Sequence, residues 1–212
     1  MSRIVVLWSG GIDSTIVLHQ ASLATYSEHE PVIALSVRSH ACGNENRFKR
    51  QTTARSNYLR FAKRIGLNIK AQEFDVTGTA WPESNGYETY LREYQVFGAW
   101  MLPFLQSGDI VCFGYYKDQR IDIEKFNSMF EAYGDIAKWN ESPSIRLPLN
   151  MWNERGSYED FVRMCLSYRI PRSCVYSCHY GDNADKCTCP KCDKARDCTI
   201  PDRECLSRKT PF

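Results

Sequence analysis

The sequence predicts an α/β protein with a doubly wound, mostly parallel sheet, followed by a small cysteine-rich segment. Three observations support this prediction. Short, β-branched apolar runs alternate with longer segments of helical periodicity, a glycine-rich turn follows the first apolar run, and seven of the ten cysteines lie after residue 173. Alternating strands and helices form a parallel sheet with helices on both faces, and such sheets bind ligands at the carboxyl ends of their strands.

The first part of the chain contains three expected strands and two expected helices. The first apolar run is short and ends at a glycine turn, which is typical of a buried parallel strand. The segment after the turn has apolar residues on one side of a helix. In order, the expected elements are a strand at 4–7, a helix at 12–24, a strand at 32–37, a polar, basic stretch at 38–55, a helix that follows it and ends near Gly66, and a strand at 69–76.

The second part of the chain continues the alternation to about residue 170. In order, the expected elements are a loop at 77–87, an aromatic-rich buried helix at 90–105, a strand followed by glycine at 109–114, a helix at 123–137, a strand at 145–149 and a helix at 158–168. Residues 1–170 are therefore expected to form one α/β domain, with residues 171–212 as a tail packed on it. The tail is too short to build its own core, so we expect a bound metal to order it.

The charge balance excludes some classes of function. There are 27 basic and 25 acidic residues, and the formal net charge is +2. Such a balance lacks the broad basic footprint of a nucleic-acid scaffold or a polybasic membrane binder. The sequence has no apolar run of membrane-spanning length and no signal peptide, so we expect no membrane partner and a cytoplasmic location. The oligomeric state stays open, with a homodimer as one option.

One stretch is locally basic and invites interpretation as an RNA-binding surface. A solvent-exposed helix face explains it better, because acidic residues elsewhere cancel the overall charge, and a nucleic-acid partner is not expected. Single arginines near its start, for example Arg38 or Arg47, are candidates to reach nucleotide phosphates. The basic residues of the stretch are Arg47, Lys49, Arg50, Arg55, Arg60, Lys63 and Arg64.

The glycine turn after the first strand is a candidate phosphate-binding loop. Two adjacent glycines permit positive φ and let a phosphate approach the main chain, where N–H groups and the helix dipole attract an anion. Hydroxyl groups add donors, and Asp13 can hold a cation beside the phosphates. The turn lacks the lysine of a Walker A loop, and a simple capped strand-to-helix turn is the alternative. The candidate residues are Ser9, Gly10, Gly11, Ile12, Asp13, Ser14 and Thr15.

The cysteine-rich tail is a candidate zinc site. Four thiolates lie within fifteen residues, and Zn²⁺ takes four such ligands tetrahedrally in closed, structural sites. A disulfide pair and an iron–sulfur cluster are the alternatives. Cys174 and Cys198 lie close enough in sequence to compete as ligands. The expected ligands are Cys178, Cys187, Cys189 and Cys192.

The candidate loop matches the S-G-G-x-D-S-T signature of the PP-loop ATP pyrophosphatases. Together with the C-terminal cysteines, it resembles the 7-cyano-7-deazaguanine synthase family, which acts in queuosine biosynthesis. The resemblance extends to Leu147-Pro148-Leu149 and to the segment 177–192. It implies a fold like that of the adenine nucleotide alpha hydrolases, with a PP-loop ATP-binding domain at 1–170 and a zinc-binding tail at 171–212.

The resemblance also implies an enzyme, an ATP-dependent ligase that forms a C–N bond. With ATP and Mg²⁺, that family adenylates the carboxylate of 7-carboxy-7-deazaguanine, and ammonia displaces AMP to give an amide. A second adenylation dehydrates the amide to a nitrile. The implied catalytic residues are Asp13, Ser14 and Arg155, with Arg155 in place of the family's lysine. The implied substrate-contacting residues are Gly114, Asp118, Arg120 and Asp122.

The sequence departs from the family where the acceptor substrate is concerned. The cysteine spacing is compressed at Cys187-Thr188-Cys189, and the segment after Gly114 is shorter than in the family. A related acid, another substrate such as a tRNA base, and a non-catalytic role in binding nucleotide and zinc are therefore alternatives. The near-neutral charge argues against tRNA, since nucleic-acid affinity depends on phosphate neutralisation.

Overall fold

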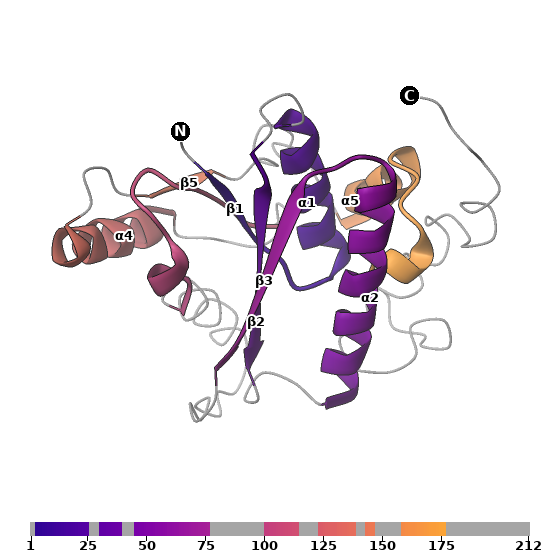
Figure 1. The fold of residues 1–212 in the computed structure, drawn as a ribbon, viewed down its shortest axis with the longest axis horizontal. Helices are drawn as coiled ribbons and strands as arrows, with labels where there is room; N and C mark the ends of the chain where they lie inside the picture. Colours follow the sequence, from indigo (N-terminus) through magenta and orange to yellow (C-terminus); the bar gives the residue numbers. More distant parts are fainter. Residues whose placement is uncertain are drawn as a thin grey trace.

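The computed structural model describes residues 3–25, 30–39, 45–76, 100–114, 123–138, 143–146 and 158–176. Within these residues the chain forms a five-stranded sheet of order β3-β2-β1-β4-β5, in which each pair of neighbours is parallel (Figure 1). The predicted α/β class with a parallel sheet is therefore confirmed. The strands are β1 Ile4–Leu7, β2 Val32–Ser39, β3 Ile69–Val76, β4 Ile110–Cys112 and β5 Ser144–Arg146.

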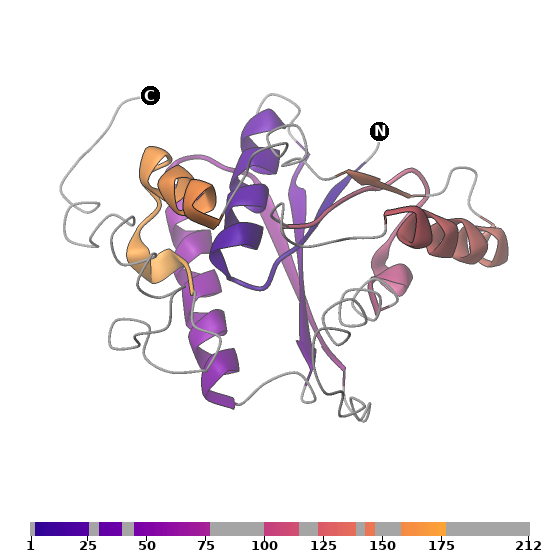
Figure 2. The same cartoon turned by 180° about the vertical axis from the view of Figure 1, so that it is seen from behind.

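Helices cover both faces of the sheet, as a doubly wound fold requires. Within the described residues, three α-helices and a short 3₁₀ helix cover one face, and an α-helix and a second 3₁₀ helix cover the opposite face (Figures 1 and 2). The first set comprises α1 Ile12–Ala24, α2 Glu45–Arg64, α5 Tyr158–Ser167 and η3 Arg172–Cys174. The second set comprises η1 Leu102–Phe104 and α4 Ile123–Ala137.

The central strand β1 is buried from both sides. Val5 and Val6 are 1% and 0% exposed, and they belong to two different apolar clusters. Val6 packs with Tyr58 and other residues of the α1, α2 and α5 face, whereas Val5 packs with Met101 and Phe130 on the other face. Because successive strand residues point to opposite faces, a continuous apolar run is what a strand covered on both sides needs.

Helix α2 begins earlier than the sequence predicts. It starts at Glu45, inside the stretch expected to be merely polar, because charged residues can occupy the solvent side of a helix while a narrow stripe faces the core. That stripe includes Ala54, Tyr58 and Phe61, all buried. The predicted stop at Gly66 is confirmed: its φ is +83°, and the next amide, of residue 67, donates to the Ala62 carbonyl.

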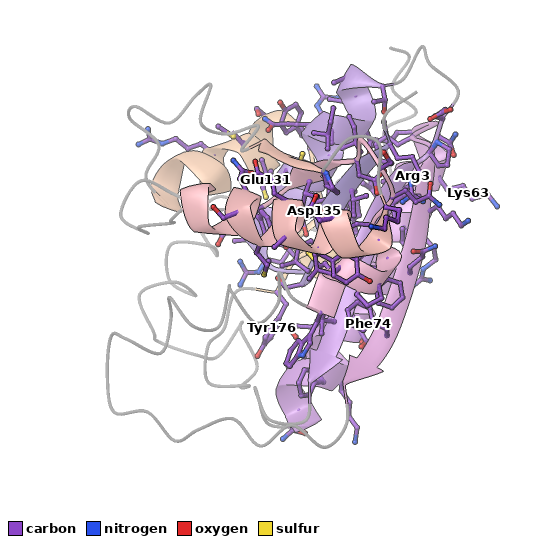
Figure 3. The ribbon with its side chains drawn as sticks, turned by 90° about the vertical axis from the view of Figure 1, so that its left-hand side faces the viewer. Arg3, Lys63, Phe74, Glu131, Asp135 and Tyr176 are labelled. Atoms are coloured by element: carbon purple, nitrogen blue, oxygen red, sulfur yellow. The ribbon has the colours of Figure 1, made fainter. Side chains whose placement is uncertain are left out.

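The start of β1 is tied to the turn before β4. The guanidinium of Arg3 donates two hydrogen bonds to Asp109, at 2.9 and 2.6 Å, and Asp109 is only 1% exposed. The second carboxylate oxygen also accepts from the main-chain N–H of Gln106 at 2.7 Å. Figure 3 places Arg3 toward the amino ends of the strands. This bidentate pair joins a buried carboxylate to a half-buried guanidinium and fixes two neighbouring strands at the end opposite the glycine turn.

Several predicted segments have a limited description. The loop at 77–87 and most of the helix at 90–105 lie outside the described residues, and residues 102–104 form η1. The predicted strand at 145–149 is described only as far as residue 146, within β5, and residues 147–149 lie outside the described residues. The predicted helix at 158–168 is α5. In the part of the chain that is described, no helix is both long and apolar enough to cross a membrane.

Candidate functional site

The sheet order places a topological switch point between β1 and β4. After β1 the chain moves outward through β2 to β3, then returns to the other side of β1 as β4. At such a point the loops that follow the two central strands diverge, and ligands of open α/β sheets bind in the crevice between them. The glycine turn follows β1, and Gly114 follows β4. Two sequence-predicted features therefore meet at the edge of the sheet where a ligand is expected.

The glycine turn ends in an uncapped helix start. Gly10 has φ +84°, and Gly11 is the N-cap of α1 with extended backbone and no side-chain cap. The first helical hydrogen bond runs from the Thr15 amide to the Gly11 carbonyl at 3.0 Å. The preceding amides of the first turn have no acceptor within the helix, and the helix dipole adds partial positive charge there. This is the arrangement that binds phosphate at a helix N-terminus.

Two serines close the turn on itself. The hydroxyls of Ser9 and Ser14 are 3.1 Å apart, and the Ser9 amide donates to the Ser14 hydroxyl at 3.2 Å. The Gly11 amide donates to the Ser9 hydroxyl at 3.1 Å. Ser14 is buried, whereas Ser9 is exposed and Asp13 half-buried. The turn therefore holds two serine hydroxyls close together, with one half-buried carboxylate beside them.

Thr15 faces the core. It is fully buried, and its hydroxyl accepts a hydrogen bond from the indole N–H of Trp8 at 3.0 Å. Trp8 is in turn fixed through its main chain, since its carbonyl accepts from the Ser36 hydroxyl at 2.7 Å. The hydroxyl of Thr15 thus supports the turn from inside, and no local sequence pattern predicts its hydrogen bond with Trp8.

Gly114 packs against the start of α1. A Cβ atom added at Gly114 would lie 2.6 Å from the Ser14 nitrogen and 2.7 Å from the Asp13 carbonyl carbon. Such separations are shorter than any contact between a Cβ and backbone atoms, so only glycine fits without movement. The structure therefore brings Gly114 to the predicted loop, although the two lie a hundred residues apart in sequence.

Helix α2 packs against one side of Gly10. A Cβ added at Gly10 would lie 2.9 Å from Cγ of Arg55 and 3.0 Å from the carbonyl oxygen of Gln51. Arg55 is 8% exposed and donates to the Ser9 carbonyl at 3.3 Å. The prediction of a solvent-exposed basic face is thus wrong for Arg55, which lies on the buried side of the helix. It is confirmed for Lys49, Arg50, Arg60, Lys63 and Arg64, all exposed.

The segment after α5 reaches the same loop. The amide of Tyr176 donates to the Gly10 carbonyl at 2.9 Å, and the side-chain amide of Asn57 donates to the Ser173 carbonyl at 2.9 Å. Figure 3 places Tyr176 toward the carboxyl ends of the strands. Cys174, left open as a zinc ligand by its sequence position, is 2% exposed and packs in the core cluster that also contains Cys165. Residues 171–176 therefore belong to the packing around the loop.

The remaining predicted site residues lie outside the described residues. These are Arg155, Asp118, Arg120, Asp122, Cys178, Cys187, Cys189 and Cys192. Within the described residues there is no group of three or more side chains suited to hold a metal ion. At the loop itself, Asp13 and the serine hydroxyls are oxygen donors. They suit Mg²⁺, which proteins commonly bind through one or two carboxylates while phosphates and water complete the shell.

His19 on α1 belongs to the core. It is 2% exposed, its Nδ1 lies 3.1 Å from the Tyr58 hydroxyl, and its ring lies 4.6 Å from that of Tyr168. Burial lowers the pKa of His19 to about 4. Burial, followed by the charges of two nearby cysteines, raises the pKa of Tyr58. Both side chains are therefore neutral at pH 7 and serve packing.

Comparison with known proteins gives little beyond this geometry. No protein-family model matches the sequence, and no curated protein matches it. Among solved structures, a protein of the universal stress protein family from Burkholderia pseudomallei matches with 13% identity and a TM-score of 0.34. The match covers 68% of this chain and 95% of that chain. A likeness at this TM-score carries no argument, and the fold assignment rests on the strand order and pairing.

Proposed function

We propose that this chain is an ATP-dependent adenylating enzyme of the PP-loop type. The observation that carries the proposal is the uncapped start of α1 at the switch point. There Gly10, Gly11 and Gly114, which have no side chains, lie close together at the carboxyl ends of β1 and β4. A nucleotide triphosphate is the ligand class that suits such a surface, because its phosphates accept hydrogen bonds from several main-chain amides at once. The proposed cofactors are ATP and Mg²⁺.

The position of Asp13 supports a metal-bound nucleotide. Its carboxylate lies in the first turn of α1, where it interacts favourably with the helix dipole but would repel a phosphate. A divalent cation between carboxylate and phosphates removes that repulsion and neutralises charge on the pyrophosphate as it leaves. Asp13 would hold the cation, and the hydroxyls of Ser9 and Ser14 would donate to phosphate oxygens.

For the substrate, we propose 7-carboxy-7-deazaguanine or a related acid, with ammonia as the second reactant. The carboxylate attacks the α-phosphorus of ATP and pyrophosphate leaves. Ammonia then attacks the acyl carbon and AMP leaves, giving an amide. A second round of ATP use converts the amide to the nitrile. The proposed substrate-side residues are Gly114, Asp118, Arg120, Asp122 and Arg155, on the strength of the sequence resemblance.

We further propose that the tail binds Zn²⁺ through Cys178, Cys187, Cys189 and Cys192 as a structural ion. A closed set of four thiolates leaves no position for substrate, so this metal would stabilise the tail and take no part in the reaction. Tyr176, the last described residue of the tail, lies beside the proposed nucleotide loop. Metal content measured by atomic spectroscopy on the purified full chain tests this proposal, with one Zn²⁺ per chain expected.

The experiment that tests the enzyme proposal is pyrophosphate release from MgATP with ammonia and 7-carboxy-7-deazaguanine. We expect release that depends on the acid, together with AMP and a nitrile product. Asp13→Asn should abolish most of it. Asp135→Asn is the matched control, because Asp135 is exposed on α4 across the sheet from α1 (Figure 3). ATP binding without release on any acid tried would contradict an enzyme, and release without this acid would contradict the substrate.

A further inference from the structure

Three main-chain carbonyl groups of the glycine turn accept hydrogen bonds from other parts of the fold. The Trp8 carbonyl accepts from the Ser36 hydroxyl of β2 at 2.7 Å, and the Gly10 carbonyl accepts from the Tyr176 amide at 2.9 Å. Between them, the Ser9 carbonyl accepts from Nη1 of Arg55 at 3.3 Å. Three successive peptide groups are therefore fixed by hydrogen bonds. Of the three donors, only Arg55, which binds the middle carbonyl, is charged.

Holding a carbonyl in this way also aims the amide that follows it. In a planar trans peptide the C=O and the next N–H point in opposite directions, and the described chain contains no cis peptide. With the Ser9 carbonyl turned toward α2, the Gly10 N–H points away from α2. Main-chain amides aimed at one point without a rearrangement are what phosphate binding requires.

The guanidinium of Arg55 is itself held in place. Nη2 donates to Glu73 on β3 at 2.7 Å and to the Thr52 hydroxyl on α2 at 3.1 Å. A planar guanidinium carries five N–H donors in a rigid fork, so it can bridge three acceptors on three elements where a lysine ammonium would not keep the same geometry. The stem contributes as well, since Cγ of Arg55 fills the space that a side chain at Gly10 would need.

We infer that Arg55 is a positioning residue for the proposed nucleotide site: it sets the conformation of the loop through the Ser9 carbonyl and supplies positive charge behind the phosphates. Glu73 fixes the guanidinium and partly neutralises it. This inference rests on the proposed function in one respect, namely that the ligand is a nucleotide with phosphates. Arg55 does not touch that ligand and acts through the main chain of the loop.

Changing the two charges of the Arg55–Glu73 ion pair separately distinguishes a positioning role from a purely structural one. Glu73→Gln keeps an oxygen acceptor for Arg55 but removes a negative charge near the anion site. Arg55→Gln removes the positive charge and the bond to the Ser9 carbonyl. A structural pair predicts the same direction of change for both variants. Positioning by Arg55 predicts that the variants differ, with nucleotide affinity lowered by Arg55→Gln and unchanged or raised by Glu73→Gln.

The experiment measures two quantities on the full chain. The first is the Kd for MgATP by calorimetry, and the second is amide hydrogen exchange of a peptide covering residues 8–12 without nucleotide. We expect Arg55→Gln to raise the Kd about tenfold and to speed exchange, because a hydrogen bond from a charged donor is lost. Arg55→Lys should recover part of the affinity by restoring charge. Arg50→Gln, on the exposed side of the same helix, should change neither quantity.

The Kd for MgATP and the exchange rate of residues 8–12 together decide whether Arg55 positions the loop. Exchange and Kd for Arg55→Gln within about twofold of wild type would overturn the inference. So would a Glu73→Gln variant that weakens MgATP binding as much as Arg55→Gln. If wild type fails to bind MgATP at all, the proposed function is wrong, but the exchange of residues 8–12 still decides whether Arg55 orders the loop. If Arg55→Gln does not fold, the comparison of Arg55→Lys with Glu73→Gln gives the same decision.

Discussion

Replacing Gly114 by alanine is the most direct test of the switch-point packing. The added Cβ would lie 2.6 Å from the Ser14 nitrogen, 2.7 Å from the Asp13 carbonyl carbon and 2.8 Å from Ser14 Cα. All three neighbours are backbone atoms of the first helical turn, so no side chain can rotate away. Gly114 does not have a positive φ, and the cost therefore comes from space alone.

The size of the effect follows from that overlap. Overpacking in a close-packed region costs about 1–3 kcal/mol, and we expect the upper part of this range because the overlapped atoms belong to a helix start. To relieve the overlap, α1 and the end of β4 must separate by several tenths of an ångström. Misplacing binding groups by about 1 Å can reduce activity about a hundredfold, so the expected loss of MgATP affinity is about tenfold or more.

The assay for Gly114→Ala combines urea unfolding with calorimetry of MgATP binding. Gly66→Ala is the matched control, because Gly66 is exposed at the end of α2 with φ +83°, and an alanine there costs about 1–2 kcal/mol through left-handed strain. That control should lose stability and keep its affinity. A Gly114→Ala variant with wild-type unfolding midpoint and wild-type affinity would refute the close approach of β4 to α1.

Three further predictions concern stability and the surroundings of the loop. Because burial lowers the pKa of His19 to about 4 from an ordinary 6.5, the unfolded chain takes up the proton first. Stability should be full above pH 6.5 and fall toward pH 4 by up to about 3 kcal/mol, and His19→Gln should flatten this slope in urea titrations at several pH values. Asp109→Asn should cost about 2 kcal/mol in the same assay at pH 7, since it removes the charge of a buried carboxylate that is hydrogen-bonded to the half-buried Arg3; a loss below about 1 kcal/mol would contradict this. Tyr176→Pro removes the amide that binds the Gly10 carbonyl, and the extended φ of −134° at the preceding residue accommodates it. It should lose about 1 kcal/mol and some MgATP affinity beyond Tyr176→Ala, which keeps the amide; equal behaviour of the two variants would argue against the contact.

Most helices and strands could be predicted from the local sequence, because helices and strands differ in the spacing of their apolar residues. The strands at 4–7 and 69–76 and the helices at 12–24 and 123–137 agree with the observed bounds. The start of α2 was missed since charged residues form helices as readily as apolar ones once a few positions face the core. The strand order could not be read from periodicity, because it depends on which strands pair after the chain leaves β3.

The candidate loop was visible in sequence, but the groups that shape it were not. Arg55 lies in a run of basic residues and differs from Arg60 only in its helical phase: it falls one turn after Gln51 and one turn before Tyr58, both buried. That phase is a usable signal, since a charged residue on a buried stripe needs a partner. Tyr176 gave no comparable signal, because its contact uses the main-chain amide, which every residue except proline carries.

The loop is therefore a short motif whose conformation is set by residues far from it in sequence. Its carbonyls are held by β2, α2 and the segment after α5, and its far side is closed by the end of β4. Fixing one residue costs about 1–2 kcal/mol of backbone entropy, so a loop ordered only on binding would lose that amount for every residue involved. Because folding has already ordered it, changes at Gly114, Arg55 or Tyr176 should weaken nucleotide binding by loosening the loop. None of the three needs to touch the phosphates for this to hold.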